Sequence, residues 1–163
     1  MLAMMMVGGV GTAHAIVPPP VVAYPTEGTG AFSVAGIGGP RSGTPGKVLD
    51  YRVAVERGIL GISPDGFAAD VASALGNVGA VRLVADGEPF DFTVYLATPA
   101  TRDELCGRGF DSYTSCRHGD RVVINVERWE LGEPEDGMDL ATYRHNVLTA
   151  ETEEELRAFP ESG

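Results

Sequence analysis

The sequence predicts a single α+β domain, in which a mixed sheet of about four strands carries one helix early and one helix late. Two observations predict this fold class. Several segments alternate apolar and polar residues as half-buried strands do, and two others repeat apolar residues at helical spacing. With 163 residues, of which 44% are hydrophobic, the chain can bury one core.

The first strand and the first helix are predicted between residues 47 and 76. In KVLDYRVAVERG (47–58), apolar side chains alternate with charged ones, which is typical of a half-buried strand. Ser63 is a good helix N-cap, and Pro64 fits the first helical turn, where no amide donor is needed. The helix that follows repeats Phe67, Val71 and Leu75 on one side, and Gly76 ends it.

Three more strands and a second helix follow. The strands are VRLVA (81–85), FDFTVYLAT (90–98) and DRVVINVERW (120–129), each with apolar residues on one face. Asp139 can cap the second helix. In that helix Leu140, Tyr143 and Val147 share a side, so the late helix is expected to pack on the sheet.

The N-terminal region predicts export. Residues 1–15 are apolar and end in Ala13-His14-Ala15, the small-x-small pattern that a signal peptidase accepts, although no basic residue precedes the apolar run. An uncleaved membrane anchor and a misassigned start codon remain open as alternatives. Residues 16–46 are rich in proline and glycine and are interpreted as a linker, so the folded unit is expected to begin near Lys47. The protein is therefore expected to be secreted or extracytoplasmic.

The net charge excludes some partners. The chain carries 12 basic and 23 acidic residues, a formal charge of −11, which repels phosphate backbones and anionic lipid surfaces. We therefore expect no nucleic acid partner and a membrane contact only through the N-terminal segment. Residues 150–163 concentrate part of this charge in an acidic C-terminal tail.

The two cysteines, Cys106 and Cys116, predict a disulfide. In an exported protein such a pair is normally oxidised, and closing this loop would stabilise the fold by roughly 2–3 kcal/mol. A metal site made by the two cysteines and His118 is the competing interpretation, but it offers at most three ligands. His118 is otherwise a turn residue, and His145 is expected on the surface of the late helix.

A specific combination of motifs is spread over five segments, which are 51–59, 92–106, 115–125, 127–132 and 139–149. The motifs include SC-x-x-GDRVVIN, RW-x-x-G and YR-x-x-V. The combination resembles a secreted bacterial family of unknown function with a zincin-like metallopeptidase core. The resemblance covers about residues 28–149. It implies that 47–149 form a zincin-like α+β domain whose late helix runs into an H-E-x-x-H zinc motif, with a further histidine beyond it. In that motif two histidines on one helical face bind zinc, and the glutamate between them activates a water.

The sequence departs from that pattern at the zinc motif itself. In the family register the first histidine is Ala150, the catalytic glutamate is Glu151 and the second histidine is Glu154. Glu151 is therefore the only catalytic candidate, and no set of metal ligands is predicted. No cofactor is expected in this chain, although the resemblance implies zinc in intact family members. The apolar stripe stops near Leu148, and Thr152 with Glu155 could form a capping box, so we expect a break followed by a short helix over 152–159.

Three functional hypotheses follow from the sequence. The first is a truncated or frame-shifted copy of the metallopeptidase-like family, inactive as written. The second is an exported, non-catalytic domain that binds a peptide or a cell-wall component, for example by strand addition. The third is an active hydrolase that borrows metal ligands from a partner chain.

Overall fold

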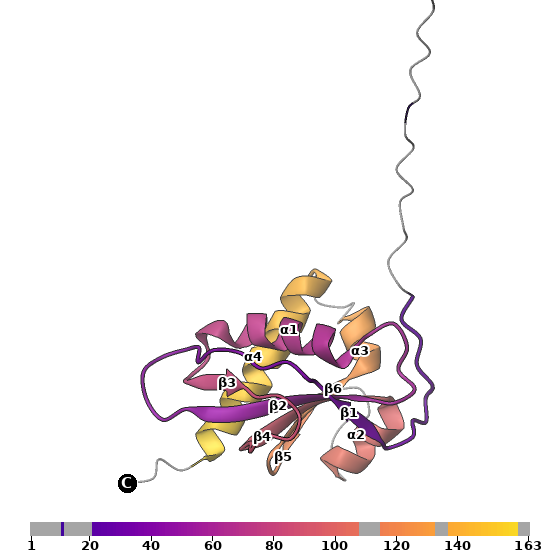
Figure 1. Cartoon of the computed structure of the whole chain (residues 1–163). Helices are drawn as coiled ribbons and strands as arrows, with labels where there is room; N and C mark the ends of the chain where they lie inside the picture. Colours follow the sequence, from indigo (N-terminus) through magenta and orange to yellow (C-terminus); the bar gives the residue numbers. More distant parts are fainter. Residues whose placement is uncertain (1–10, 12–20, 108–114, 133–136, 160–163) are drawn as a thin grey trace, which may run out of the picture.

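The computed structural model describes residues 11, 21–107, 115–132 and 137–159. Over these residues the chain forms one mixed sheet of six strands with four α-helices, which confirms the α+β class (Figure 1). The sheet has more strands, and carries more helices, than the sequence predicts. The elements are β1 Phe32–Val34, β2 Leu49–Glu56, α1 Pro64–Ala74, the 3-10 turn η1 Leu75–Asn77, β3 Val81–Leu83, β4 Phe92–Ala97, α2 Pro99–Cys106, β5 Cys116–His118, β6 Arg121–Asn125, α3 Val126–Leu131 and α4 Leu140–Ala158.

The sheet is built around three parallel strands. Its order is β1-β2-β4-β6-β5, with β2, β4 and β6 parallel and β1 and β5 antiparallel to their neighbours. Strand β3 pairs in parallel with the first residues of β2. Strand β1 pairs with the last residues of β2, along the same edge. The register places Val53 opposite Val94 and Val94 opposite Val122, so β-branched side chains line up across the centre of the sheet.

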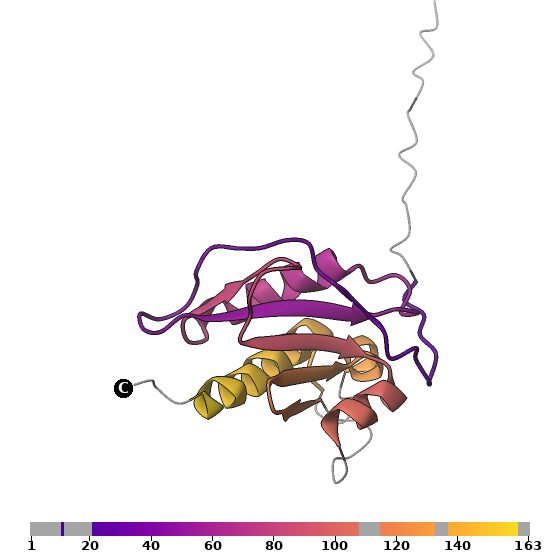
Figure 2. The ribbon, with the colours of Figure 1, turned by 60° about the horizontal axis from the view of Figure 1, so that its bottom comes forward.

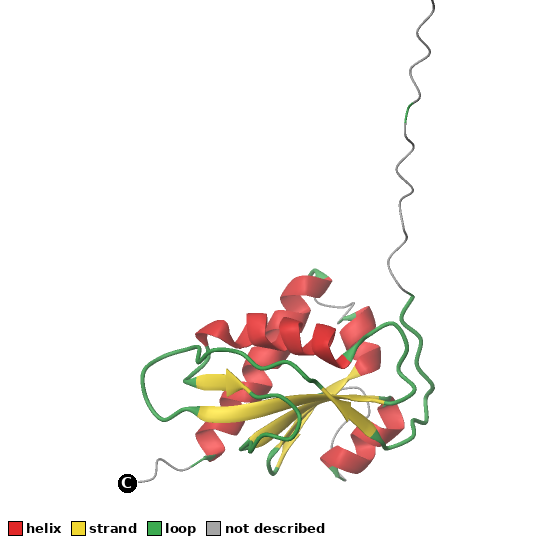
Figure 3. Ribbon diagram, in the orientation of Figure 1, coloured by secondary structure: helices red, strands yellow, loops and turns green. Residues whose placement is uncertain are grey.

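The helices cover both faces of the sheet unequally. Helices α1, α3 and α4 pack on one face, where a single large cluster joins Phe67, Trp129 and Leu148 to the strands (Figure 3). Helix α2 lies on the other face, where Cys106 and Cys116 pack with Ala97 and Val123 (Figure 2). Because helices cover both sides of the central strands, most residues of β2, β4 and β6 are buried.

Both predicted helix caps are confirmed. The Ser63 hydroxyl accepts a hydrogen bond from the Gly66 amide at 3.0 Å, and Pro64 opens α1. The Asp139 carboxylate accepts from the Thr142 amide at 2.9 Å at the start of α4. These contacts satisfy amide groups that have no partner within the helix.

The predicted strand over 120–129 is too long. Strand β6 ends at Asn125, whose side chain accepts a hydrogen bond from the Glu127 amide at 3.0 Å and so caps α3. The apolar alternation continues into VERWEL because Val126 and Trp129 also face the core from the helix. Over so few residues, strand and helix spacings are hard to tell apart.

Helix α2 was not predicted, and a buried carboxylate explains where it begins. Glu56, at the end of β2, accepts from the Thr98 amide at 2.7 Å and from the Thr98 hydroxyl at 2.8 Å. The same carboxylate accepts from the Thr101 hydroxyl and from the Gly30 amide. Gly28 must be a glycine here, since a Cβ would overlap the Glu56 carboxylate. One buried anion therefore joins β2, α2 and the N-terminal segment.

The described part of the expected linker is folded. Strand β1 pairs with β2, Ala35 is fully buried, and Ser42 forms a bridge with Val81. The folded part of the chain therefore begins before Lys47, as a correction to the sequence-based boundary. Backbone hydrogen bonds to the sheet, such as that from the Ala35 amide to the Val53 carbonyl, help to hold the segment, and its composition does not reveal them.

The expected signal segment, residues 1–15, lies outside the described residues except for Gly11. Among the helices of the described ranges, none combines the length and the apolar character needed to cross a membrane.

Helix α4 is continuous from Leu140 to Ala158, so the predicted break after Leu148 is wrong. Leu148, Thr152 and Glu155 form one buried side of this helix. Instead of capping a new helix, Glu155 pairs with Arg117 of β5, with Nε and Oε2 2.6 Å apart. Leu156 and Phe159 also pack against the core, and this burial outweighs the few tenths of a kcal/mol that acidic residues cost near a helix C-terminus.

The predicted disulfide between Cys106 and Cys116 is confirmed. It joins the last residue of α2 to the first residue of β5, with the Cα atoms 6.0 Å apart. Both cysteines are buried, and neither sulfur is available for the competing metal site with His118.

We expect loss of this disulfide to destabilise the domain. Replacing both cysteines (Cys106→Ala with Cys116→Ala) should lower the free energy of unfolding by roughly 2–3 kcal/mol, because the unfolded chain regains the entropy of the open loop. Urea denaturation of the variant beside the oxidised and reduced wild-type protein measures the effect. Equal midpoints for oxidised and reduced wild type would contradict it.

Candidate functional site

The packing of α4 decides which side chains each of its faces presents. Thr152 and Glu155 point into the fold, whereas Ala150 and Glu154 are exposed on the opposite side. Arg144 and His145 face α1 across a pocket. The family's zinc motif positions and this pocket therefore lie on different faces of one helix.

Glu151, the predicted catalytic residue, is half-buried on α4 and makes no hydrogen bond to the described residues. Burial raises the pKa of its carboxyl, and the neighbouring Glu154 raises it further. The positive charge of Arg102, a fully buried residue of α2, acts in the opposite direction. Burial and a neighbouring carboxylate account for the raised pKa, so the shift by itself does not indicate an acid–base role.

The residues around Glu151 do not fit a zinc ion. Alanine at position 150 has no donor atom, and Glu154 could supply a single oxygen. Within the described ranges, no three His, Cys, Asp or Glu side chains are grouped closely enough to hold a metal. His118 on β5 and His145 on α4 are both exposed and lie on separate elements.

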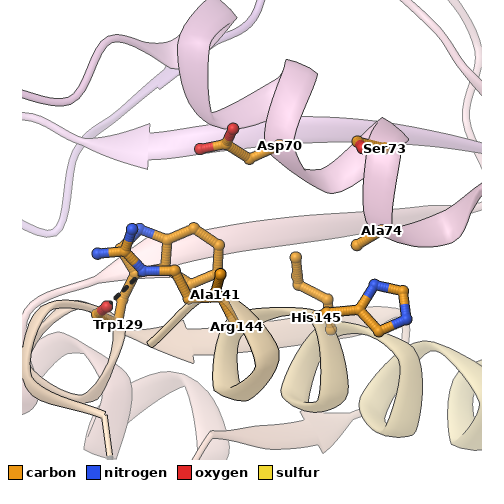
Figure 4. Close-up of a pocket in the computed structure, with 8 residues that line it drawn as sticks. Asp70, Ser73, Ala74, Trp129, Ala141, Arg144 and His145 are labelled. Atoms are coloured by element: carbon orange, nitrogen blue, oxygen red, sulfur yellow. Dashed lines mark hydrogen bonds between the residues drawn. The ribbon is translucent and has the colours of Figure 1, made fainter. Parts of the chain in front are cut away.

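A pocket of about 350 Å³ lies between α1 and α4 (Figure 4). Its floor is formed by Trp129 of α3 and Leu148 of α4, both of which are buried. The Trp129 ring is itself held edge-on against Phe67, with the ring centroids 5.1 Å apart. Polar side chains surround this apolar floor, and the pocket is lined by Asp70, Ser73, Ala74, Trp129, Ala141, Arg144, His145 and Leu148.

Arg144 is the most constrained polar group of the pocket. Its guanidinium carbon lies 4.7 Å from the centre of the Trp129 ring, a cation–π contact. Its Nε donates to the Trp129 carbonyl at 2.7 Å, and one terminal nitrogen donates to Glu130 at 3.2 Å. The charge is thus placed at the pocket wall in one orientation.

Asp70 stands opposite Arg144. It lines the pocket from α1 (Figure 4), is exposed, and its carboxylate has no ion-pair or hydrogen-bond partner among the described residues. The pocket therefore holds a positive and a negative group on facing helices that do not neutralise each other. Sequence reasoning missed this arrangement because Asp70, Trp129 and Arg144 come from three elements that no local pattern connects.

The buried side of α4 carries polar atoms that lack a hydrogen-bond partner among the described residues. Neither the Thr152 hydroxyl nor Oε1 of Glu155 has a hydrogen-bond partner in the part of the chain that the structure describes. Burial raises the pKa of Glu155, whereas the hydrogen bond and charge of Arg117 lower it; Asp120 and Glu154 add a smaller raising effect. The net direction is upward because desolvation outweighs the ion pair.

Comparison with known proteins places the chain in a family. Residues 18–157 match the family DUF3152, whose members are described as proteins of unknown function. This chain belongs to the DUF3152 family. No curated protein and no solved structure matches it. The DUF3152 match begins before β1 and includes nearly all of α4, so the N-terminal segment, the pocket and Glu151 all lie within the family domain.

We expect the stability of this DUF3152 domain to rise as the solution is acidified from about pH 7 toward about pH 5. The folded-state pKa values of Glu151 and Glu155 lie above their ordinary value of 4.5, so the folded protein binds protons that the unfolded chain does not. The stabilisation is complete below the unfolded pKa and is lost as the pH rises through the folded pKa.

The matched variants are Glu155→Gln and, as control, Glu153→Gln at an exposed position of the same helix. Urea unfolding across the pH range should show a flatter dependence for Glu155→Gln and an unchanged one for Glu153→Gln. A stability curve of Glu155→Gln parallel to wild type would refute this role of Glu155.

Proposed function

We propose that this DUF3152 chain is an exported domain with a zincin-like, metallopeptidase-like core that does not hydrolyse peptides through zinc. The likeness of its motifs to a metallopeptidase-like family supports the choice of core. The arrangement of a mixed sheet, an early helix α1 and a long late helix α4 on one face is consistent with it.

The chemistry of α4 carries this proposal. The two positions that would be zinc-binding histidines in the family register are Ala150 and Glu154, and they lie together on the exposed side of the helix. Glu151 retains a carboxylate between them, but a carboxylate without a metal-bound water has nothing to activate by the family's mechanism. The buried face of α4 offers no substitute, because Glu155 is already paired with Arg117.

Export is supported by two features. The Cys106–Cys116 disulfide persists only where thiols are not kept reduced, which favours an extracytoplasmic protein. The apolar N-terminal residues ending in Ala13-His14-Ala15 fit the signal peptide interpretation.

The proposal predicts that the untagged, full-length chain retains no stoichiometric zinc and that Glu151→Gln leaves any background peptide cleavage unchanged. Elemental analysis after equilibrium dialysis against zinc, together with cleavage of an unstructured protein substrate, measures both. Stoichiometric zinc with chelator-sensitive cleavage that is lost in Glu151→Gln would overturn the proposal. The same result at high protein concentration only would support ligands borrowed from a partner chain.

A gain-of-function variant makes this test sharper. Ala150→His combined with Glu154→His places two histidines one helical turn apart on the exposed face of α4. We expect weak zinc binding, since the two added histidines are only two of the four ligands of a structural zinc site, and the described residues hold no metal-binding group of three. Binding as tight as that of a complete site would show that further ligands are already in place.

A second candidate function is a non-catalytic domain that binds a peptide or a cell-wall component. The pocket between α1 and α4 favours it, because Arg144 is held in one orientation by Trp129 and Glu130 before any ligand arrives. A polar group fixed in advance at the wall of a concave, partly apolar pocket is typical of small-molecule binding sites.

A further inference from the structure

We propose that the pocket between α1 and α4 binds the zwitterionic backbone of a free amino acid or dipeptide, with the carboxylate at Arg144 and the ammonium group at Asp70. The proposal rests on the binding function suggested above and specifies its ligand. It follows from the separation of two opposite charges across one pocket.

Arg144 can receive a carboxylate without giving up its present contacts. A guanidinium has five N–H donors, and the contacts with the Trp129 carbonyl and Glu130 use two of them. The remaining donors have no partner in the described residues, and a planar guanidinium matches a carboxylate in a paired geometry. Because Arg144 is already held against Trp129, little side-chain entropy is lost when the ligand binds.

Glu130 limits the strength of this contact. It shares Arg144 with any incoming anion, with its carboxylate 3.2 Å from the guanidinium. A lone anion would therefore meet a partly neutralised cation. A second interaction at the far side of the pocket is needed for selective binding.

Asp70 supplies that second interaction. It lines the α1 wall of the pocket, opposite the wall that carries Arg144, and no described cation pairs with its carboxylate. The Ser73 hydroxyl, one helical turn further along α1, lines the same wall and adds a hydrogen-bonding group. An ammonium group placed here would gain a charge-assisted hydrogen bond that a blocked amine cannot make in the same way.

The size and floor of the pocket restrict the ligand. A volume of about 350 Å³ is at the small end of ligand pockets, which favours an amino acid or a dipeptide over a longer chain. Leu148 and Trp129 offer an apolar floor for a small side chain such as a methyl group. The ligand class is therefore a short, unblocked peptide with small side chains.

The test is a titration of the full chain with alanyl-alanine, followed by two-dimensional NMR of the backbone amides. We expect saturable shifts in α1 and α4. Acetylating the amine or amidating the carboxylate should each weaken binding by about tenfold, the order expected for one lost charge-assisted contact. Equal binding of the free and the doubly blocked dipeptide, or no binding of either, would overturn the proposal.

Variants assign the two ends of the ligand. Asp70→Asn should abolish the preference for a free amine while keeping the preference for a free carboxylate. Arg144→Lys keeps the charge but loses the paired geometry, so it should reduce the preference for a free carboxylate while keeping the preference for a free amine. Glu153→Gln, on the exposed part of α4, should bind as wild type. Tryptophan fluorescence reports whether Arg144→Lys has disturbed Trp129. Weakening that does not depend on which end is blocked would contradict the assignment.

The outcome is separable from that of the proposed function. If the dipeptide does not bind and the chain holds no zinc, the ligand assignment fails while the non-catalytic proposal stands. If the dipeptide is hydrolysed in a zinc-dependent way, the non-catalytic proposal fails, even if the dipeptide binds in this pocket.

Discussion

The packing of α4 on the sheet is the constraint that places the pocket residues and the zinc motif positions. Leu148, Thr152 and Glu155 turn one side of the helix into the core, and the ion pair between Glu155 and Arg117 ties its C-terminal half to β5. Once that side is buried, helical geometry dictates the other faces. Ala150 then faces outward and Arg144 faces α1.

Two buried carboxylates, those of Glu56 and Glu155, join elements that are distant in the sequence. Glu56 is fully hydrogen-bonded and brings the end of β2, the start of α2 and the N-terminal segment together. In the part of the chain that the structure describes, Oε1 of Glu155 has no hydrogen-bond partner, and a buried oxygen left without one costs about 1–3 kcal/mol. The apolar contacts of Leu148, Leu156 and Phe159 offset that cost, so α4 stays helical through its acidic end.

Local sequence signals predicted the parts of the fold that are made locally. Ser63 and Asp139 cap the helices as expected, and the alternation in β2 and β4 is that of real strands. The signals failed where distant contacts decide the structure. Segment 31–35 is ordered by backbone pairing with β2. Helix α4 continues past Leu148 because Leu156 and Phe159 pack on the core and Glu155 pairs with Arg117. For the same reason the pocket could not be foreseen, although His145 was noted on its helix.

The orientation of α4 can be measured directly by cysteine accessibility. Single substitutions Ala150→Cys, Thr152→Cys and Glu154→Cys are reacted with a maleimide under non-reducing conditions, where the native cysteines are held in their disulfide. We predict fast labelling at 150 and 154, and labelling at 152 only after urea is added. Labelling at 152 as fast as at 150 in the native protein would contradict the buried face of α4, and with it the placement of both the zinc motif positions and the pocket.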